Sequence, residues 1–240
     1  MNRGKLYGVG VGPGDPELLT LKARRILLEA DVVAVPDKGS GEKTALNIVK
    51  DVVEGKNLLP CPTPMVRDKA LLDGCYEEIA GRICALLDEG KNVAFITLGD
   101  PTLYSTYIYV HKKVLARGYD AELIPGVPSI CAVAAKLGTS LCESAERLLV
   151  VPASYEGVDD CLDFPANKAF MKAGKSLPAL RDKLRERGLD GEMVANCGMT
   201  CLLYTSPDGG SWRPRPQRFG RRGARLLEER PGGCGLPGGV

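Results

Sequence analysis

The chain has 240 residues, of which 44% are hydrophobic and 26% are charged, and its formal net charge is +2. These values are ordinary for a globular protein with one large or two modest domains, and so small a net charge gives no reason to expect nucleic acid as a partner. Because no apolar run approaches the length of a membrane span and no basic-apolar leader follows Met1, we expect neither a membrane protein nor an exported one.

Nine cysteines are scattered along the chain, an odd number without paired Cys-x-x-Cys spacing. We interpret them as reduced thiols of a cytoplasmic protein, not as a disulfide framework or a zinc site. His111 is the only histidine, which excludes His-centred catalytic triads and multi-His metal sites. Because it falls in a helical pattern, we expect it to be structural, and we predict no metal site.

The first 124 residues alternate short apolar runs, typical of buried strands, with amphipathic segments, typical of helices. This alternation predicts an α/β fold with a mainly parallel sheet and helices on both of its faces. Asp15 and Pro16 are favourable residues for the start of a helix. The predicted elements are strands at 5–10, 31–36, 57–60, 92–98 and 121–124, and helices at 16–29, 44–53, 68–89 and 102–117.

The segment Pro125–Ser129 contains one glycine and two prolines, so we predict a hinge into a second domain there. The two domains are expected at 1–124 and 125–200, each a sheet flanked by helices. Glycine in the hinge also allows the backbone to approach a ligand closely. The second domain is predicted to contain a helix ending near 137, strands at 147–151, 168–172 and 192–196, a helix at 177–187, and a short helix or loop over 155–167.

Residues 201–240 differ in composition from the rest, with nine Gly, five Pro and seven Arg but no Lys and no Ile. Only Arg225–Glu229 carries a weak structural pattern, so we expect this tail to be disordered or loosely packed. A change of reading frame in a GC-rich gene would produce the same bias, and this alternative remains open.

The strand at 92–98 ends in Gly99-Asp100-Pro101, where a helix is predicted to begin. In open α/β sheets, the crevice outside the carboxyl ends of the strands is where ligands bind. Asp15, Asp37 and Asp100 should converge at this edge, which suits a cationic ligand with adenosine-like hydrogen-bonding needs. Alternatively, Asp15 and Asp100 only cap helices.

The glycine-rich loop Gly8–Asp15 does not fit the dinucleotide-binding fingerprint. Counted from Gly8, the third glycine position is Pro13, and counted from Gly10 it is Asp15. Pro13 also lacks the N–H group that a phosphate site would use. These residues argue against an ATP- or NAD-binding protein, and favour a loop that approaches a ligand through its backbone.

Five motifs in the same order resemble the tetrapyrrole (corrin/porphyrin) methylase family over residues 1 to about 200. Pro64–Asp68, Thr97–Tyr107 and Phe170–Lys175 resemble the branch that methylates carbon 20 of precorrin-2 or cobalt-factor II. The tail does not match. The family would continue with a hairpin and a final core strand that this sequence does not show, so the resemblance implies a second domain without that strand. The five motifs are Gly8–Pro16, Leu98–Pro101, Pro125–Ile130, Phe170–Lys172 and Asn196–Gly198.

The resemblance implies a two-domain enzyme of cobalamin biosynthesis that uses S-adenosyl-L-methionine, with the cofactor at the domain interface, a tetrapyrrole substrate and a homodimeric assembly in the cytoplasm. Net charge and the lack of a long apolar run already argue against nucleic acid and membrane as partners. The cofactor-binding residues that it implies are Leu98, Gly99, Asp100, Leu103, Ser129, Ile130, Met171 and Cys197, and the residues implied near the substrate are Gly12, Pro13, Gly14, Asp15, Asp37 and Arg67.

No catalytic residue is assigned, because the tetrapyrrole's own meso carbon would attack the methyl group. Asp37, Asp100 or a ring nitrogen are the candidates for the proton acceptor. Lys38, Arg67, Lys172 and Lys175 are candidate partners of the substrate carboxylates. The alternatives are another tetrapyrrole methylase, such as the uroporphyrinogen III enzyme, and a damaged homologue without activity.

Overall fold

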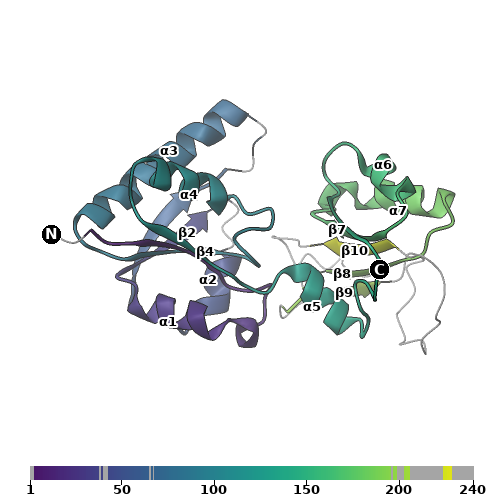
Figure 1. Ribbon diagram of the computed structural model, residues 1–240, viewed down its shortest axis with the longest axis horizontal. Helices are drawn as coiled ribbons and strands as arrows, with labels where there is room; N and C mark the ends of the chain where they lie inside the picture. The colour runs from purple at the N-terminus through teal and green to yellow at the C-terminus, as the bar shows by residue number, and fades with distance from the viewer. Residues whose placement is uncertain are drawn as a thin grey trace, which may run out of the picture. The chain divides into compact units, whose positions relative to one another are not determined.

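The computed structural model describes residues 3–37, 39, 43–64, 66, 68–195 and 197–198, and the backbone of two strands at 203–205 and 224–228. The chain divides between Pro128 and Ser129 into two compact units, each with a five-stranded sheet (Figure 1). The sequence pattern places this division four residues earlier, after residue 124. Each unit is described by itself below.

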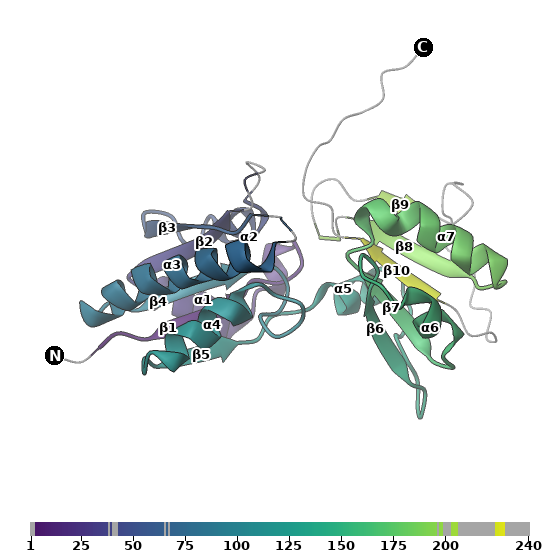
Figure 2. The ribbon, with the colours of Figure 1, turned by 90° about the horizontal axis from the view of Figure 1, so that it is seen from above.

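The sheet of the first unit is parallel throughout, with the strand order β3-β2-β4-β1-β5 (Figure 2). All five predicted strands are present, which confirms the expected α/β fold with a mainly parallel sheet. Three of these strands, β2, β4 and β1, have neighbours on both sides, which explains their almost continuously apolar sequences. The strands are β1 (Leu6–Gly10), β2 (Val32–Asp37), β3 (Asn57–Pro62), β4 (Val93–Thr97) and β5 (Ala121–Ile124).

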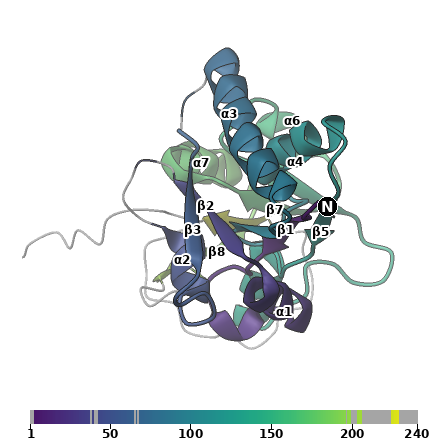
Figure 3. The ribbon, with the colours of Figure 1, turned by 90° about the vertical axis from the view of Figure 1, so that its left-hand side faces the viewer.

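Helices cover both faces of this sheet (Figure 3). On one face, α1 (Leu21–Glu29) and α2 (Thr44–Val49) pack against Val9 and Ile96 of the strands. On the other, α3 (Lys69–Asp88) and α4 (Tyr107–Ala116) pack against Leu6 and Phe95. Among the described residues, no helix is long and apolar enough to cross a membrane.

Two helix starts differ from the predictions. Asp15 caps only a short 3₁₀ helix, η1 (Pro16–Leu18), and Thr20 then caps α1 by accepting the Ala23 N–H at 3.1 Å. The helix predicted from residue 102 begins at Tyr107. Asp100 closes a turn with Thr102, and Tyr104 has a left-handed φ of 52°, so this segment cannot continue as a helix.

The second unit has the strand order β6-β7-β10-β8-β9, in which only the β8–β9 pair is antiparallel. Figure 1 shows α6 and α7 on one face of this sheet and α5 on the other. Its core contains Phe170 of β7, Leu162 of α6 and Leu180 of α7. The elements are α5 (Ser129–Lys136), β6 (Leu148–Pro152), α6 (Val158–Asp163), β7 (Asn167–Met171), η2 (Gly174–Ser176), α7 (Leu177–Glu186), β8 (Gly191–Ala195), β9 (Leu203–Thr205) and β10 (Ala224–Glu228).

The expectation that the second sheet lacks a final core strand is wrong. The strand β10 lies between β7 and β8 and pairs in parallel with both of them. Pairing on two sides satisfies its backbone N–H and C=O groups, and this can stabilise a strand whose own sequence pattern is weak. The other residues of the 201–240 stretch, and with them the predicted disorder, lie outside the described residues.

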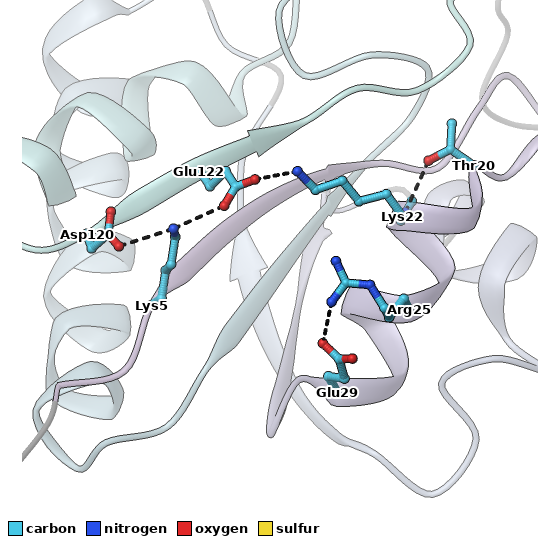
Figure 4. A network of polar contacts seen from close by, with 8 residues as sticks. Lys5, Thr20, Lys22, Arg25, Glu29, Asp120 and Glu122 are labelled. Atoms are coloured by element: carbon cyan, nitrogen blue, oxygen red, sulfur yellow. Dashed lines mark hydrogen bonds and ion pairs between the residues drawn. The ribbon is translucent and has the colours of Figure 1, made fainter.

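An ion network holds the edge strand β5 at the amino ends of the first sheet (Figure 4). The Lys5 ammonium lies 3.2 Å from the Asp120 carboxylate and 3.0 Å from that of Glu122. The Lys22 ammonium of α1 lies 2.6 Å from the other oxygen of Glu122. Hydrogen bonds from Lys22, and next from Lys5, lower the pKa of the Glu122 carboxyl below its ordinary value.

We predict that the substitution Glu122→Gln destabilises the protein at pH 7 but not in acid. The folded-state pKa of Glu122 is lowered, so its contribution to stability is present above its unfolded pKa of about 4.3 and is lost as the pH falls through the folded-state value. We expect a loss of at most about 1 kcal/mol, because the pair is partly exposed to water. Urea unfolding at pH 7 and in acid measures it.

Glu29→Gln is the matched control, since Glu29 has one exposed ion pair with Arg25, one turn away on the same helix (Figure 4). We expect a smaller loss for Glu29→Gln at pH 7. Equal losses for the two variants, or a Glu122→Gln loss that does not change with pH, would contradict the role given to the network.

Candidate functional site

The candidate site lies at the carboxyl ends of the strands in the first unit. The strands β1 and β4 are neighbours, but the chain continues from β1 to α1 on one face and from β4 to α4 on the other. Two adjacent strands whose connections leave toward opposite faces form a topological switch point, where open α/β sheets bind their ligands. The loops that follow β1 and β4 contain most of the site residues predicted in this unit.

A pair of backbone hydrogen bonds joins these two loops. The Gly12 N–H donates to the Gly99 carbonyl at 3.2 Å, and the Gly99 N–H donates to the Gly12 carbonyl at 2.8 Å. Gly12 has a φ of 79° and Gly99 a φ of 71°, and residues other than glycine rarely adopt such positive values. The structure therefore brings Gly12 and Gly99, predicted for substrate and for cofactor, into direct contact.

Glycines also let a third loop, after β5, pack against the first two. A Cβ atom on Gly126 would lie 2.3 Å from the Gly99 carbonyl oxygen, and one on Gly10 would lie 2.7 Å from the Gly126 nitrogen. The Gly126 backbone thus packs on protein backbone on the side where a Cβ would lie. By contrast, a Cβ on Gly99 would meet nothing within 4 Å. Gly99 thus has open space at this edge, as does Gly39 in the loop after β2.

The three predicted carboxylates all lie at this edge, and each closes a turn of its own loop. The Oδ1 atom of Asp15 accepts the Glu17 N–H at 2.9 Å, and that of Asp37 accepts the Gly39 N–H at 2.8 Å. In the same way, Asp100 Oδ1 accepts the Thr102 N–H at 2.7 Å. Such turns are typical of Asp after a strand.

Among the described contacts, Asp100 differs from the other two carboxylates because both of its oxygens accept hydrogen bonds from the protein. Its Oδ2 atom accepts the Gly126 N–H at 3.0 Å, which joins the loop after β4 to the loop after β5. Asp100 is therefore not the cap of a long helix, as one prediction had it. Its hydrogen bonds hold the loop that contains Leu98, Gly99 and Leu103 against the loop after β5.

Sequence reasoning did not identify the packing behind this loop. A Cβ atom on Gly8 would lie 1.9 Å from the Tyr107 ring, so the ring occupies the space that Gly8 leaves in β1. The Tyr107 hydroxyl lies 2.9 Å from Nδ1 of His111. His111 is buried, and burial lowers its pKa, in agreement with the structural role expected for it. No sequence signal relates a strand glycine to a tyrosine far along the chain.

The remaining predicted cofactor residues belong to the second unit. Ser129 and Ile130 are buried in the first turn of α5. Met171 ends β7 and Cys197 follows β8, so these two lie at the carboxyl edge of the second sheet. Burial raises the pKa of the Cys197 thiol, which keeps it protonated at neutral pH and unsuited to act as a nucleophile.

The remaining predicted substrate residues are Arg67 and the loop residues that follow Gly12. Arg67, predicted near the substrate, lies outside the described residues, so its position is not given. Pro13, Gly14 and Asp15 continue from Gly12 along the loop after β1, and the first two are buried. In the part of the chain that the structure describes, no group of three or more His, Cys, Asp or Glu side chains could hold a metal ion.

Comparison with known proteins relates this arrangement to one family. The model described as Tetrapyrrole (Corrin/Porphyrin) Methylases matches residues 5–201. A Methanocaldococcus jannaschii protein named probable cobalt-precorrin-2 C(20)-methyltransferase is 45% identical over 149 residues, which are 62% of this chain and 64% of that protein. The chain thus spans less than two thirds of this relative's length. The cobalt-precorrin-2 C(20)-methyltransferase of Salmonella typhimurium is 31% identical over 88% of each chain.

A solved structure shares the fold. It is the uroporphyrin-III C-methyl transferase from Thermus thermophilus complexed with S-adenyl homocysteine, with a TM-score of 0.63 and 20% identity. The match covers 88% of this chain and 94% of that one.

We predict that Gly126→Ala destabilises the protein by about 2 kcal/mol or more. The added methyl group would overlap the Gly99 carbonyl oxygen, so two loops would have to separate and lose the Asp100–Gly126 hydrogen bond. Gly74→Ala is the matched control, because Gly74 lies in α3 with nothing within 4 Å of the new Cβ, and alanine favours a helix. We expect it to be neutral or stabilising. Urea unfolding of both variants measures this, and a Gly126→Ala variant as stable as Gly74→Ala would contradict the packing.

Proposed function

Because the chain belongs to the tetrapyrrole (corrin/porphyrin) methylases, we propose that it transfers a methyl group from S-adenosyl-L-methionine to carbon 20 of precorrin-2 or cobalt-factor II in cobalamin biosynthesis. The observation that carries the proposal is the 31% identity to the Salmonella typhimurium C(20)-methyltransferase over 88% of each chain. The Methanocaldococcus jannaschii relative, at 45% identity, is also named as a C(20)-methyltransferase.

The loop after β4 fits the cofactor in its chemistry. S-adenosyl-L-methionine supplies an electrophilic methyl group on a sulfonium cation, beside an adenosine that needs hydrogen-bond donors and acceptors. Leu98 and Leu103 offer backbone groups and apolar side chains. Gly99, whose own N–H and C=O bind Gly12, leaves open space in which a ligand can lie against the backbone. We assign these residues and Asp100 to the cofactor, together with Ser129, Ile130, Met171 and Cys197, which the family resemblance implies.

The loop after β1 is assigned to the substrate. Gly12, Pro13, Gly14 and Asp15 follow β1 at the same edge, fastened to the cofactor loop through Gly12 and Gly99. These hydrogen bonds keep a substrate on one loop at a constant position relative to a cofactor on the other. Such alignment accelerates a displacement reaction. Lys172, Lys175 and Arg67 stay proposed partners of the substrate carboxylates.

The chain's own groups need supply no nucleophile, since the ring carbon of the substrate attacks the methyl group. A base is needed only for the proton that leaves the methylated carbon. Asp100 is a weaker candidate than the sequence indicates, because both of its oxygens already accept N–H bonds. Asp37, with its Oδ1 bound to Gly39, and a ring nitrogen of the substrate remain as proton acceptors.

We also propose that the enzyme acts in the cytoplasm as a homodimer. The homodimer comes from the family resemblance. The cytoplasmic location agrees with the odd number of scattered cysteines. Sedimentation of the purified full chain measures the mass, and 25.7 kDa would correspond to the monomer.

The proposed activity predicts a product heavier by one methyl group. The purified full chain is incubated with S-adenosyl-L-methionine and either precorrin-2 or cobalt-factor II, and the product is analysed by mass spectrometry and by NMR with a ¹³C-methyl label. We expect one labelled methyl on carbon 20. Methyl groups on carbons 2 and 7 of uroporphyrinogen III would instead assign the enzyme to sirohaem synthesis, and no mass gain with any of the three would refute the proposal.

A further inference from the structure

A pair of hydroxyl groups closes the base of the loop assigned to the cofactor. Thr97 is the last residue of β4, and Ser105 lies two residues before α4. Their side-chain oxygens, Thr97 Oγ1 and Ser105 Oγ, lie 2.8 Å apart, in hydrogen-bonding contact. The seven residues between them include Leu98, Gly99, Asp100 and Leu103, the whole first-unit set assigned to S-adenosyl-L-methionine. We call Thr97 and Ser105 the hydroxyl pair.

The hydroxyl pair attaches the downstream end of this loop to the end of β4. Gly99 is bound to Gly12, and Asp100 is bound to Gly126, so the first half of the loop is held by two other loops. The second half contains Tyr104, whose left-handed φ of 52° costs energy for a residue other than glycine. A conformation of this kind persists only where neighbouring contacts enforce it.

The hydroxyl pair lies between a buried strand end and a buried tyrosine. Thr97 is 9% exposed and ends a strand paired on both sides. Ser105 Oγ also accepts the N–H of Tyr107 at 3.3 Å, and the Tyr107 ring is fully buried in the space above Gly8. The pair thus ties the end of the loop to the core without projecting into the open space at Gly99.

We propose that Thr97 and Ser105 are positioning residues that set the affinity for S-adenosyl-L-methionine by holding the loop at 98–104 in its binding conformation. The inference rests on the proposed function. Without the hydroxyl pair, the downstream end of the loop gains conformations, and cofactor binding must then order it at a cost in entropy. The packing of the sheet and helices does not depend on this pair, so affinity falls more than stability does.

The test compares Thr97→Val, Ser105→Ala and the double variant by calorimetry with S-adenosylhomocysteine. Each single variant loses the hydrogen bond between the two hydroxyls and should bind about fivefold more weakly. Ser105→Ala also removes the acceptor of the Tyr107 N–H, so Thr97→Val is the cleaner test of the pair. The double variant should bind no more weakly than the single ones, because removing both partners leaves no unpaired hydroxyl. Thr97→Ser keeps the hydroxyl and should restore the wild-type Kd. In the methyl-transfer assay, KM for the cofactor should rise while kcat changes little.

Thr20→Ala is the matched control, since it removes a hydroxyl hydrogen bond of 3.1 Å that caps α1. We expect this variant to melt at a lower temperature and to bind with the wild-type Kd. Wild-type Kd values for Thr97→Val and Ser105→Ala would overturn the inference, and so would an equal rise in Kd for Thr20→Ala. If the unaltered chain does not bind S-adenosylhomocysteine, the proposed function itself is refuted. That result is distinct from wild-type affinity in the variants, which refutes only the role of the hydroxyl pair.

Discussion

Three loops at the carboxyl edge of the first sheet meet backbone against backbone, and this contact is the constraint on which the candidate site depends. Gly10, Gly99 and Gly126 approach so closely that a Cβ on Gly10 or Gly126 would overlap the atoms of another loop. The hydrogen bonds between Gly12 and Gly99, and between Asp100 and Gly126, then fix the loops to one another. The site is therefore a rigid assembly of main-chain groups, set directly on the ends of buried strands.

This rigidity suits the proposed chemistry. Methyl transfer from a sulfonium requires alignment of the reacting atoms and exclusion of water more than it requires a strong acid or base. The carboxylates at this edge bind backbone N–H groups of their own loops, which turn the chain at the ends of β1, β2 and β4. The residues that look most reactive in the sequence are thus largely structural, and the glycines define where a ligand can approach.

Much of the first unit could be predicted from the sequence, because buried parallel strands have apolar runs that local reasoning detects. The late start of α4 could not, since it depends on the turn at Asp100 and the left-handed Tyr104. The role of Gly126 and the fit of Tyr107 over Gly8 depend on contacts between distant segments. The sequence does not predict the central strand β10, because this strand depends on pairing with β7 and β8, and the pattern of its own five residues is weak.

The central claim is that a ligand approaches the backbone at Gly99, and one comparison of affinities tests it directly. Gly99 has a φ of 71° and Gly118 a φ of 77°, and neither has any atom within 4 Å of a new Cβ. Gly118 lies between α4 and β5, before the amino end of that strand, so alanine causes the same strain at both positions but adds a methyl group at the site only in Gly99→Ala. We predict that calorimetry with S-adenosylhomocysteine gives a Kd raised at least about tenfold for Gly99→Ala and unchanged for Gly118→Ala. Equal Kd values for the two variants would contradict the account.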